Sequence, residues 1–155
     1  MELAQIAQQM NLQFAGREIG RLLAARPNPW MNLSPEEFGA RICSAKLLSA
    51  RIQDKWLKLS LSTGDEILIY PGISGEVDVL EKLPALAFPF SGRLIYLGFD
   101  GAGCLRVRPG LFGRFYLSNG RNVLPLRGFW RWMSPQDGVT CSWIRRKRPD
   151  TPASR

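Results

Sequence analysis

The sequence contains no histidine and only three cysteines, and both scarcities exclude classes of chemistry. Without histidine there is no Ser-His-Asp or Cys-His catalytic centre, no histidine general base and no histidine metal ligand. Three sulfurs cannot complete a four-ligand zinc site, and their odd number argues against a secreted disulfide scaffold. The cysteines also lie far apart, at Cys43, Cys104 and Cys141. We therefore expect no metal and no cofactor.

Long apolar runs are missing as well. The longest spans residues 83–90 and is interrupted by Pro84 and Pro89. The first residues carry no basic segment like that of a signal peptide. Because a membrane-spanning helix needs about 20 consecutive apolar residues, we expect no membrane segment and a cytoplasmic protein.

The 155 residues are 45% apolar and 22% charged, which is typical of one soluble globular domain, and we expect a monomer. A first helix is predicted near the start, where apolar residues recur at helical spacing and a glycine follows as the stop. These residues are Leu3, Ile6, Met10 and Phe14, with Gly16 as the stop.

A second helix is predicted to begin at residues 34–37, where a serine cap, a proline at the first helical position and a glutamate form a capping box. Short strands are predicted around it, at residues 17–25, 57–61, 66–70, 93–99, 104–108 and 115–118. Two helices with about seven short strands predict an α+β fold whose body is a sandwich or a barrel.

The net charge of +8 is concentrated in the last third of the chain. Residues 1–100 hold 10 basic and 11 acidic side chains, whereas residues 101–155 hold 11 basic and 2 acidic ones. The basic run at 145–148 alone is typical of a solvated tail. Other arginines lie among apolar residues, at Arg106, Arg108, Arg114, Arg121 and Arg127. Because arginine grips phosphate with a planar fork, this distribution predicts a nucleic-acid-binding surface.

Five segments, in order and at compatible spacing, resemble motifs of the formamidopyrimidine-DNA glycosylase/endonuclease VIII (Fpg/Nei) family. Residues 14–19 resemble the end of the family's first helix, and residues 34–38 resemble the start of its second helix. Residues 54–59 resemble its Gly-Lys-Tyr-Leu-Leu-Leu strand, which carries a catalytic lysine. Residues 71–75 resemble its Leu-Gly-Met-Ser-Gly loop, and residues 108–114 resemble its Asp-Pro-Arg-Arg-Phe-Gly loop. The resemblance implies that family's N-terminal domain, a β-sandwich of about seven or eight short antiparallel strands flanked by two helices.

The resemblance also implies site residues. Lys55 matches the lysine that assists lyase chemistry in the family, although by itself it reads as a surface lysine. Ile73 and Phe112 match positions that fill the void left by a flipped base, and for Phe112 an ordinary core position is an equal interpretation. Leu111 replaces the arginine that faces the orphaned base, and leucine cannot make that arginine's hydrogen bonds.

The family's catalytic N-terminus is altered. There a terminal proline amine attacks the sugar and the neighbouring glutamate acts as the acid. A gapless alignment places Met1 on the family's second proline, whereas a gapped one places Glu2 on the glutamate and shortens the helix. A primary amine at Met1, with an ordinary pKa of about 7.7–8.0, can still condense with an aldehyde. Residues 121–155 do not match the family's helix–two-turn–helix domain or its zinc finger.

We therefore predict three parts: an Fpg/Nei-like sandwich (residues 1–118), a final hairpin with an aromatic and arginine-rich extension (119–144), and a disordered basic tail (145–155). The predicted function is that of a nucleoid-associated DNA-binding protein, related to base-excision-repair glycosylases, whose excision activity is impaired or lost. One alternative is a minimal abasic-site lyase or glycosylase that uses Lys55 or the Met1 amine. A second is a non-enzymatic module whose basic tail binds RNA or an acidic protein.

Overall fold

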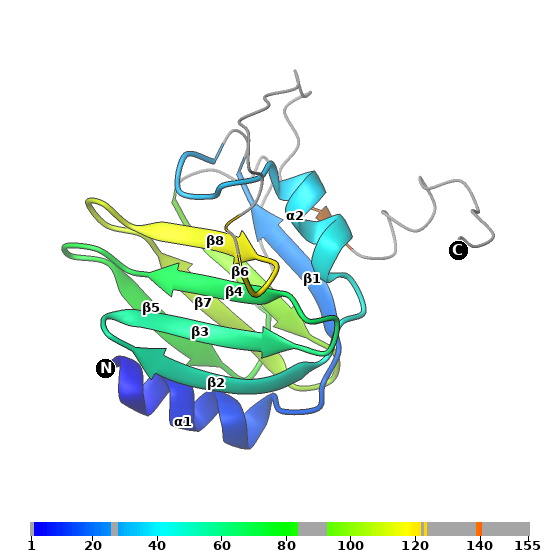
Figure 1. Cartoon of the computed structure of the whole chain (residues 1–155). Coiled ribbons are helices and arrows are strands. Elements are labelled where there is room, and N and C mark those ends of the chain that lie inside the picture. The colour runs from blue at the N-terminus through cyan, green and yellow to red at the C-terminus, as the bar shows by residue number, and fades with distance from the viewer. Residues whose placement is uncertain (1, 26–27, 84–92, 122, 124–138, 141–155) are drawn as a thin grey trace.

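In the computed structural model, which describes residues 2–25, 28–83, 93–121, 123 and 139–140, two antiparallel sheets face each other as a sandwich (Figure 1). One sheet has the order β5-β7-β6-β1-β9 and the other the order β2-β3-β4-β8. The strands are β1 (Ile19–Ala24), β2 (Leu47–Gln53), β3 (Trp56–Leu61), β4 (Glu66–Tyr70), β5 (Glu76–Leu80), β6 (Ile95–Phe99), β7 (Gly103–Arg108), β8 (Arg114–Ser118) and β9 (Val139–Thr140). The helices are α1 (Leu3–Gln13) and α2 (Pro35–Ile42).

The core lies between the two sheets because apolar residues alternate along the strands. In β3, Leu57, Leu59 and Leu61 are buried, while Lys58 and Ser60 point outward and are only half-buried. This is the alternation that predicted the strand, since successive side chains of a strand point to opposite faces. The predicted α+β sandwich is therefore confirmed.

The two helices close the open sides of the sandwich. Helix α1 contacts β2 and β5, the outer strands of the two sheets on one side, and α2 packs against β1 and β9 on the other. The fully buried Phe14, just after α1, stacks on Phe99 with ring centroids 4.3 Å apart. Phe38 of α2 packs against Phe115 of β8 at 5.2 Å. Each helix thus contributes an aromatic ring to the core.

The predicted helix ends are largely confirmed. Gly16, with φ of +81°, follows α1 in the left-handed conformation that suits a helix stop. At α2, the Ser34 hydroxyl accepts a hydrogen bond from the Glu37 N–H at 3.1 Å, as the capping box requires. The Glu37 carboxylate accepts the Ser34 hydroxyl proton at 3.2 Å instead of reaching the backbone N–H of Ser34, so the second half of the box differs.

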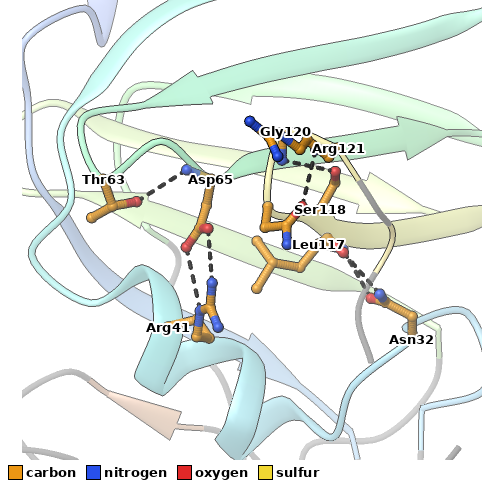
Figure 2. Close-up of polar contacts among 9 residues, drawn as sticks. Asn32, Arg41, Thr63, Asp65, Leu117, Ser118, Gly120 and Arg121 are labelled. Atoms are coloured by element: carbon orange, nitrogen blue, oxygen red, sulfur yellow. Dashed lines mark hydrogen bonds and ion pairs between the residues drawn. The ribbon is translucent and has the colours of Figure 1, made fainter. Parts of the chain in front are cut away.

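Two asparagine side chains pair with the outer strands of the four-stranded sheet as a peptide group would. Asn11 of α1 donates to the Ala50 carbonyl of β2 at 2.8 Å and accepts from the Ala50 N–H at 2.7 Å. Asn32 does the same with Leu117 of β8, at 2.9 and 2.8 Å (Figure 2). Because an unpaired edge strand leaves donors and acceptors open, each of these side chains satisfies one residue of an edge strand.

An ion pair fastens α2 to the turn between β3 and β4. The Arg41 guanidinium donates two hydrogen bonds to the Asp65 carboxylate, at 2.9 and 3.4 Å (Figure 2). Asp65 is only 6% exposed, and its backbone N–H donates to the Thr63 hydroxyl. A buried carboxylate needs such partners, since an unpaired buried charge is costly.

Beyond residue 118, the structure describes only residues 119–121, 123 and 139–140, so it bears on part of the predicted extension. Ser118 forms an antiparallel bridge with Val123, as the predicted hairpin at Asn119-Gly120 requires. Strand β9 pairs with β1. The remainder of the predicted extension, including the aromatic cluster at 129–133, and the tail at 145–155 lie outside the described residues. Strands β2 and β5 were not predicted individually; a register shift after Leu47 interrupts the alternation of β2.

We expect Asn32→Ala to lower the free energy of unfolding by about 1–3 kcal/mol, because it leaves the Leu117 N–H and carbonyl without partners. Asn32→Asp keeps the acceptor and loses the donor, so its effect should also be destabilising. Gln8→Ala, at an exposed position of α1, is the matched control and should stay within about 0.5 kcal/mol of the wild type. Urea unfolding midpoints measure all three, and equal midpoints for Asn32→Ala and Gln8→Ala would contradict the edge-pairing role.

Candidate functional site

Two loops at one end of the sandwich are hydrogen-bonded to each other. They join β4 to β5 (residues 71–75) and β7 to β8 (residues 109–113), and we call them the paired loops. The Ile73 N–H donates to the Leu111 carbonyl at 2.9 Å, and the Leu111 N–H donates to the Ile73 carbonyl at 3.0 Å. The Gly110 N–H donates to the Pro71 carbonyl at 2.8 Å. Because these bonds are backbone to backbone, the two loops form one rigid unit.

Glycines make this close approach possible. A Cβ on Gly72 would overlap the Leu111 carbonyl oxygen, and a Cβ on Gly110 would overlap the Ile73 carbonyl oxygen. Gly72 also has φ of +79°, where side chains are disfavoured. These glycines therefore serve the close approach of one loop to the other.

The paired loops present three apolar side chains to solvent: Ile73 is 58% exposed, and Leu111 and Phe112 are each 61% exposed. We call these three the apolar tip. The interpretation of Phe112 as a core residue is therefore wrong, because its place in a surface turn directs the ring outward. Phe112 has φ of +66°, a left-handed conformation that is strained for a bulky residue. An exposed aromatic ring held in a strained backbone is a feature that clusters at functional sites.

An open pocket of about 680 Å³ lies beside the apolar tip. Its lining comes from the start of α1, the β2–β3 turn, the first of the paired loops and the outer strand β5, and Figure 1 places these at one end of the sandwich. The lining residues that bear on chemistry are Leu3, Lys55, Tyr70, Ile73, Asp78 and Arg106. The structure therefore brings together Lys55 and Ile73, which the resemblance named from distant parts of the chain.

The expected N-terminal groups lie at the entrance to α1. Glu2 is exposed and is the N-cap of the helix, but its side chain makes no capping hydrogen bond. It directly precedes Leu3, which lines the pocket. Met1 lies outside the described residues. Lys55 is exposed in the β2–β3 turn, after Asp54, which has φ of +58°.

Two of the expected DNA-binding arginines are paired with acids of the neighbouring strand. Arg106 contacts Asp78 at 2.7 Å, and Arg108 contacts Glu76 at 3.1 Å. Both pairs follow the β5–β7 register. The hydrogen bond to Asp78 raises the pKa of Arg106 above its already high value. Asp78 and Glu76 therefore neutralise the positive charges of Arg106 and Arg108.

Of the other three arginines, Arg127 lies outside the described residues, and Arg114 and Arg121 lie at opposite ends of β8. Arg114, at the start of the strand, donates to the Gly113 carbonyl at 2.9 Å, and its guanidinium lies 6.0 Å from the centroid of the Tyr116 ring. Arg121 lies past the far end of β8 and is exposed. The structure thus separates Arg121 from the apolar tip.

Sequence reasoning missed Tyr70 and Asp78 of the pocket. Tyr70 ends a predicted strand immediately before the loop that carries Ile73, so its position was the available signal. Asp78 reaches the pocket only because β5 pairs with β7, which no local pattern indicates.

The buried Cys104 lies near Arg106 on β7. Burial raises the pKa of the Cys104 thiol to about 11, and the nearby Arg106 opposes this only in part, so the thiol is protonated at neutral pH. Among residues 2–25, 28–83, 93–121 and 123, no group of three or more Cys, Asp or Glu side chains is arranged to hold a metal ion. The helices described here include none that is long and apolar enough to cross a membrane.

Comparison with known proteins identifies the fold. No protein-family model and no curated protein matches the sequence. Among solved structures, MutM in complex with DNA containing carbocyclic 8-oxo-G matches with a TM-score of 0.62 and 14% identity over 76% of this chain and 43% of that one. Fpg (MutM) of Lactococcus lactis with DNA containing FAPY-dG has the same TM-score and identity over 75% of this chain and 42% of that one.

A third match, also with a TM-score of 0.62 and 14% identity, is LlFpg in a complex with THF-DNA and an inhibitor, over 75% of this chain and 41% of that one. The chain thus spans about two-fifths of the length of these relatives. The fold implied by the sequence resemblance is confirmed: the described residues have the fold of the N-terminal domain of the Fpg (MutM) DNA glycosylases.

Proposed function

We propose that this chain binds DNA at interrupted or damaged positions, with the apolar tip inserted where a base is missing or turned out. The observation that carries the proposal is the exposure of Ile73, Leu111 and Phe112 on loops whose backbones are locked together. Exposed apolar side chains have no favourable place in water, but between unstacked bases they are buried. Insertion also offsets the cost of unstacking, which is lowest where a base is already absent or damaged.

The fold likeness supports DNA as the partner, because the three solved relatives were each determined with DNA. Their whole-protein activity is not transferred, since the chain covers about two-fifths of them. One feature favours impaired base excision: the Leu111 side chain presents no hydrogen-bonding group to an orphaned base.

A second candidate function, abasic-site lyase activity, is favoured by one observation: Lys55 lines the pocket beside Ile73. A lysine Nζ adds to the C1′ aldehyde of an opened abasic sugar and water leaves, which forms an iminium. Loss of a C2′ proton then expels the 3′ phosphate and cuts the strand. This chemistry needs no metal and no excision of a base, so an exposed lysine beside the pocket is sufficient for it.

Phe112→Ala should weaken binding to duplex DNA with an abasic site more than binding to intact duplex, because only the former offers a gap for the ring. Stability should change by no more than about 0.5 kcal/mol, since the side chain is exposed. Leu48→Ala, which truncates an apolar side chain that is 59% exposed on β2, is the matched control and should change neither affinity. Fluorescence anisotropy and thermal melts measure both effects; equal losses for the two DNAs would contradict the wedge role.

Binding to DNA should fall steeply with salt, with a slope of about 0.9 in log–log form for each neutralised phosphate. Arg121→Ala should reduce that slope by about 1 if the exposed guanidinium contacts a phosphate. Arg17→Ala removes an exposed arginine near the opposite end of α1 and serves as the control. A slope near zero for the unmodified protein would overturn the nucleic-acid proposal.

Borohydride reduction should trap the protein covalently on abasic DNA if the lyase candidate is correct, because hydride converts the iminium to a stable amine. Lys55→Ala should abolish most of this trapping, whereas Lys46→Ala, an exposed lysine at the other end of the sheet, should leave it unchanged. Trapping that survives Lys55→Ala and disappears on acetylation of the terminal amine would assign the reaction to Met1. Excision of 8-oxoguanine from an intact duplex is expected to be undetectable, and robust excision would contradict impaired glycosylase activity.

A further inference from the structure

The outward face of the four-stranded sheet carries an aromatic cluster. Trp56 of β3 contacts Tyr70 of β4, with ring centroids 5.5 Å apart, and Tyr116 of β8 at 6.4 Å. All three rings are half-buried, whereas their strand neighbours Leu57, Ile69, Phe115 and Leu117 point inward and are buried. We call Trp56, Tyr70 and Tyr116 the aromatic platform. It crosses three adjacent strands, so it is a continuous surface.

No described helix covers this platform. Helix α1 packs along the β2 side of the sandwich and α2 along the β1 side, and Figure 1 views the four-stranded sheet from its outer face with both helices at the margins. Partly exposed rings in contact across three strands form an apolar patch of the kind that marks an interaction surface.

Cations surround the platform. Arg51, Lys58 and Arg114 occupy outward positions of this sheet, and Glu66 is the one acid at an outward position of β2, β3, β4 or β8. Glu66 is paired with Arg51 at 3.1 Å. Lys58 and Arg114 contact neutral groups. Lys58 donates to the Gln53 amide oxygen at 2.6 Å, and Arg114 donates to the Gly113 carbonyl at 2.9 Å and lies 6.0 Å from the centroid of the Tyr116 ring. The platform therefore has a positive surround.

We propose that the aromatic platform binds single-stranded DNA, with bases stacked on Trp56 and Tyr116 and phosphates held by Lys58 and Arg114. Rings that stack on bases beside cations that hold phosphates are the recurrent means of binding an unpaired strand. Duplex DNA cannot stack on the platform in this way, because the faces of its bases are covered by the adjacent base pairs. The positive surround complements the phosphate backbone.

The choice of DNA as the strand rests on the proposed function. Tyr70 belongs to both the platform and the pocket beside the apolar tip, so the two surfaces adjoin at this residue. A strand bound at the pocket can therefore extend onto the platform. The protein would then recognise DNA next to a damaged site in its unpaired form.

The test measures anisotropy of a labelled deoxythymidine oligonucleotide of about 12 nucleotides, within the range of single-strand sites on small domains. Trp56→Ala should weaken its binding about tenfold, or about 1.4 kcal/mol, because the variant loses the ring on which a base stacks. Trp56→Phe keeps a ring and should retain most of the affinity, which guards against a folding artefact. Lys58→Gln should lower the salt slope by about 0.7, the value for one phosphate of a single strand.

Controls separate this proposal from the wedge. Phe112→Ala should leave oligonucleotide binding unchanged, and Trp56→Ala should leave the preference for an abasic over an intact duplex unchanged. Leu48→Ala, on β2 outside the platform, should alter neither. If the unmodified protein binds the single strand but shows no preference for an abasic over an intact duplex, the proposed function is overturned and the platform proposal stands.

Three results would overturn the platform proposal. One is no binding of the oligonucleotide at low salt, and another is equal affinity of the unmodified protein and of folded Trp56→Ala. The third is a self-associated protein that becomes monomeric on Trp56→Ala, measured by sedimentation, since the platform would then be a contact between copies of the chain. A uridine oligonucleotide of equal length that binds more tightly than the thymidine one would assign the surface to RNA instead of DNA.

Discussion

At each edge of the four-stranded sheet, an asparagine side chain pairs with the strand as a peptide group would. Asn11 and Asn32 each offer one donor and one acceptor to a single edge residue, Ala50 and Leu117 respectively. Asn11 belongs to α1, and Asn32 lies in the segment that leads to α2. The hydrogen bonds therefore position the elements that close the sandwich, and the start of α1 is held beside the β2–β3 turn that carries Lys55.

At that end of the sandwich, backbone contact decides which side chains face outward. The paired loops approach so closely that glycine is required at Gly72 and Gly110, and the side chains that remain point to solvent. Phe112 has the strained φ of +66° and is nevertheless exposed, so the strain is not offset by burial in this chain. A bound partner that buries the ring supplies a physical reason for keeping it, and this reasoning underlies the proposed insertion into DNA.

Charge contributes less at the pocket than the composition indicates. Asp78 and Glu76 pair with Arg106 and Arg108, so these arginines can contact phosphate only by sharing or leaving their acids. In the proposed recognition of DNA, apolar contacts at the tip and base stacking on the sheet therefore contribute more to specific binding than these paired arginines do. Tyr70 lies between the two surfaces, which makes a single strand path across them geometrically simple.

The sequence by itself determined the helices and several strands, because helical spacing, alternation and turn residues are local patterns. It also pointed to Lys55, Ile73 and Phe112 through a resemblance in short motifs. Only the tertiary structure decided that Phe112 is exposed, that Asp78 pairs with Arg106, and that Trp56, Tyr70 and Tyr116 form one surface. These outcomes depend on which strands become neighbours, and strand pairing joins residues whose separation along the chain leaves no local pattern.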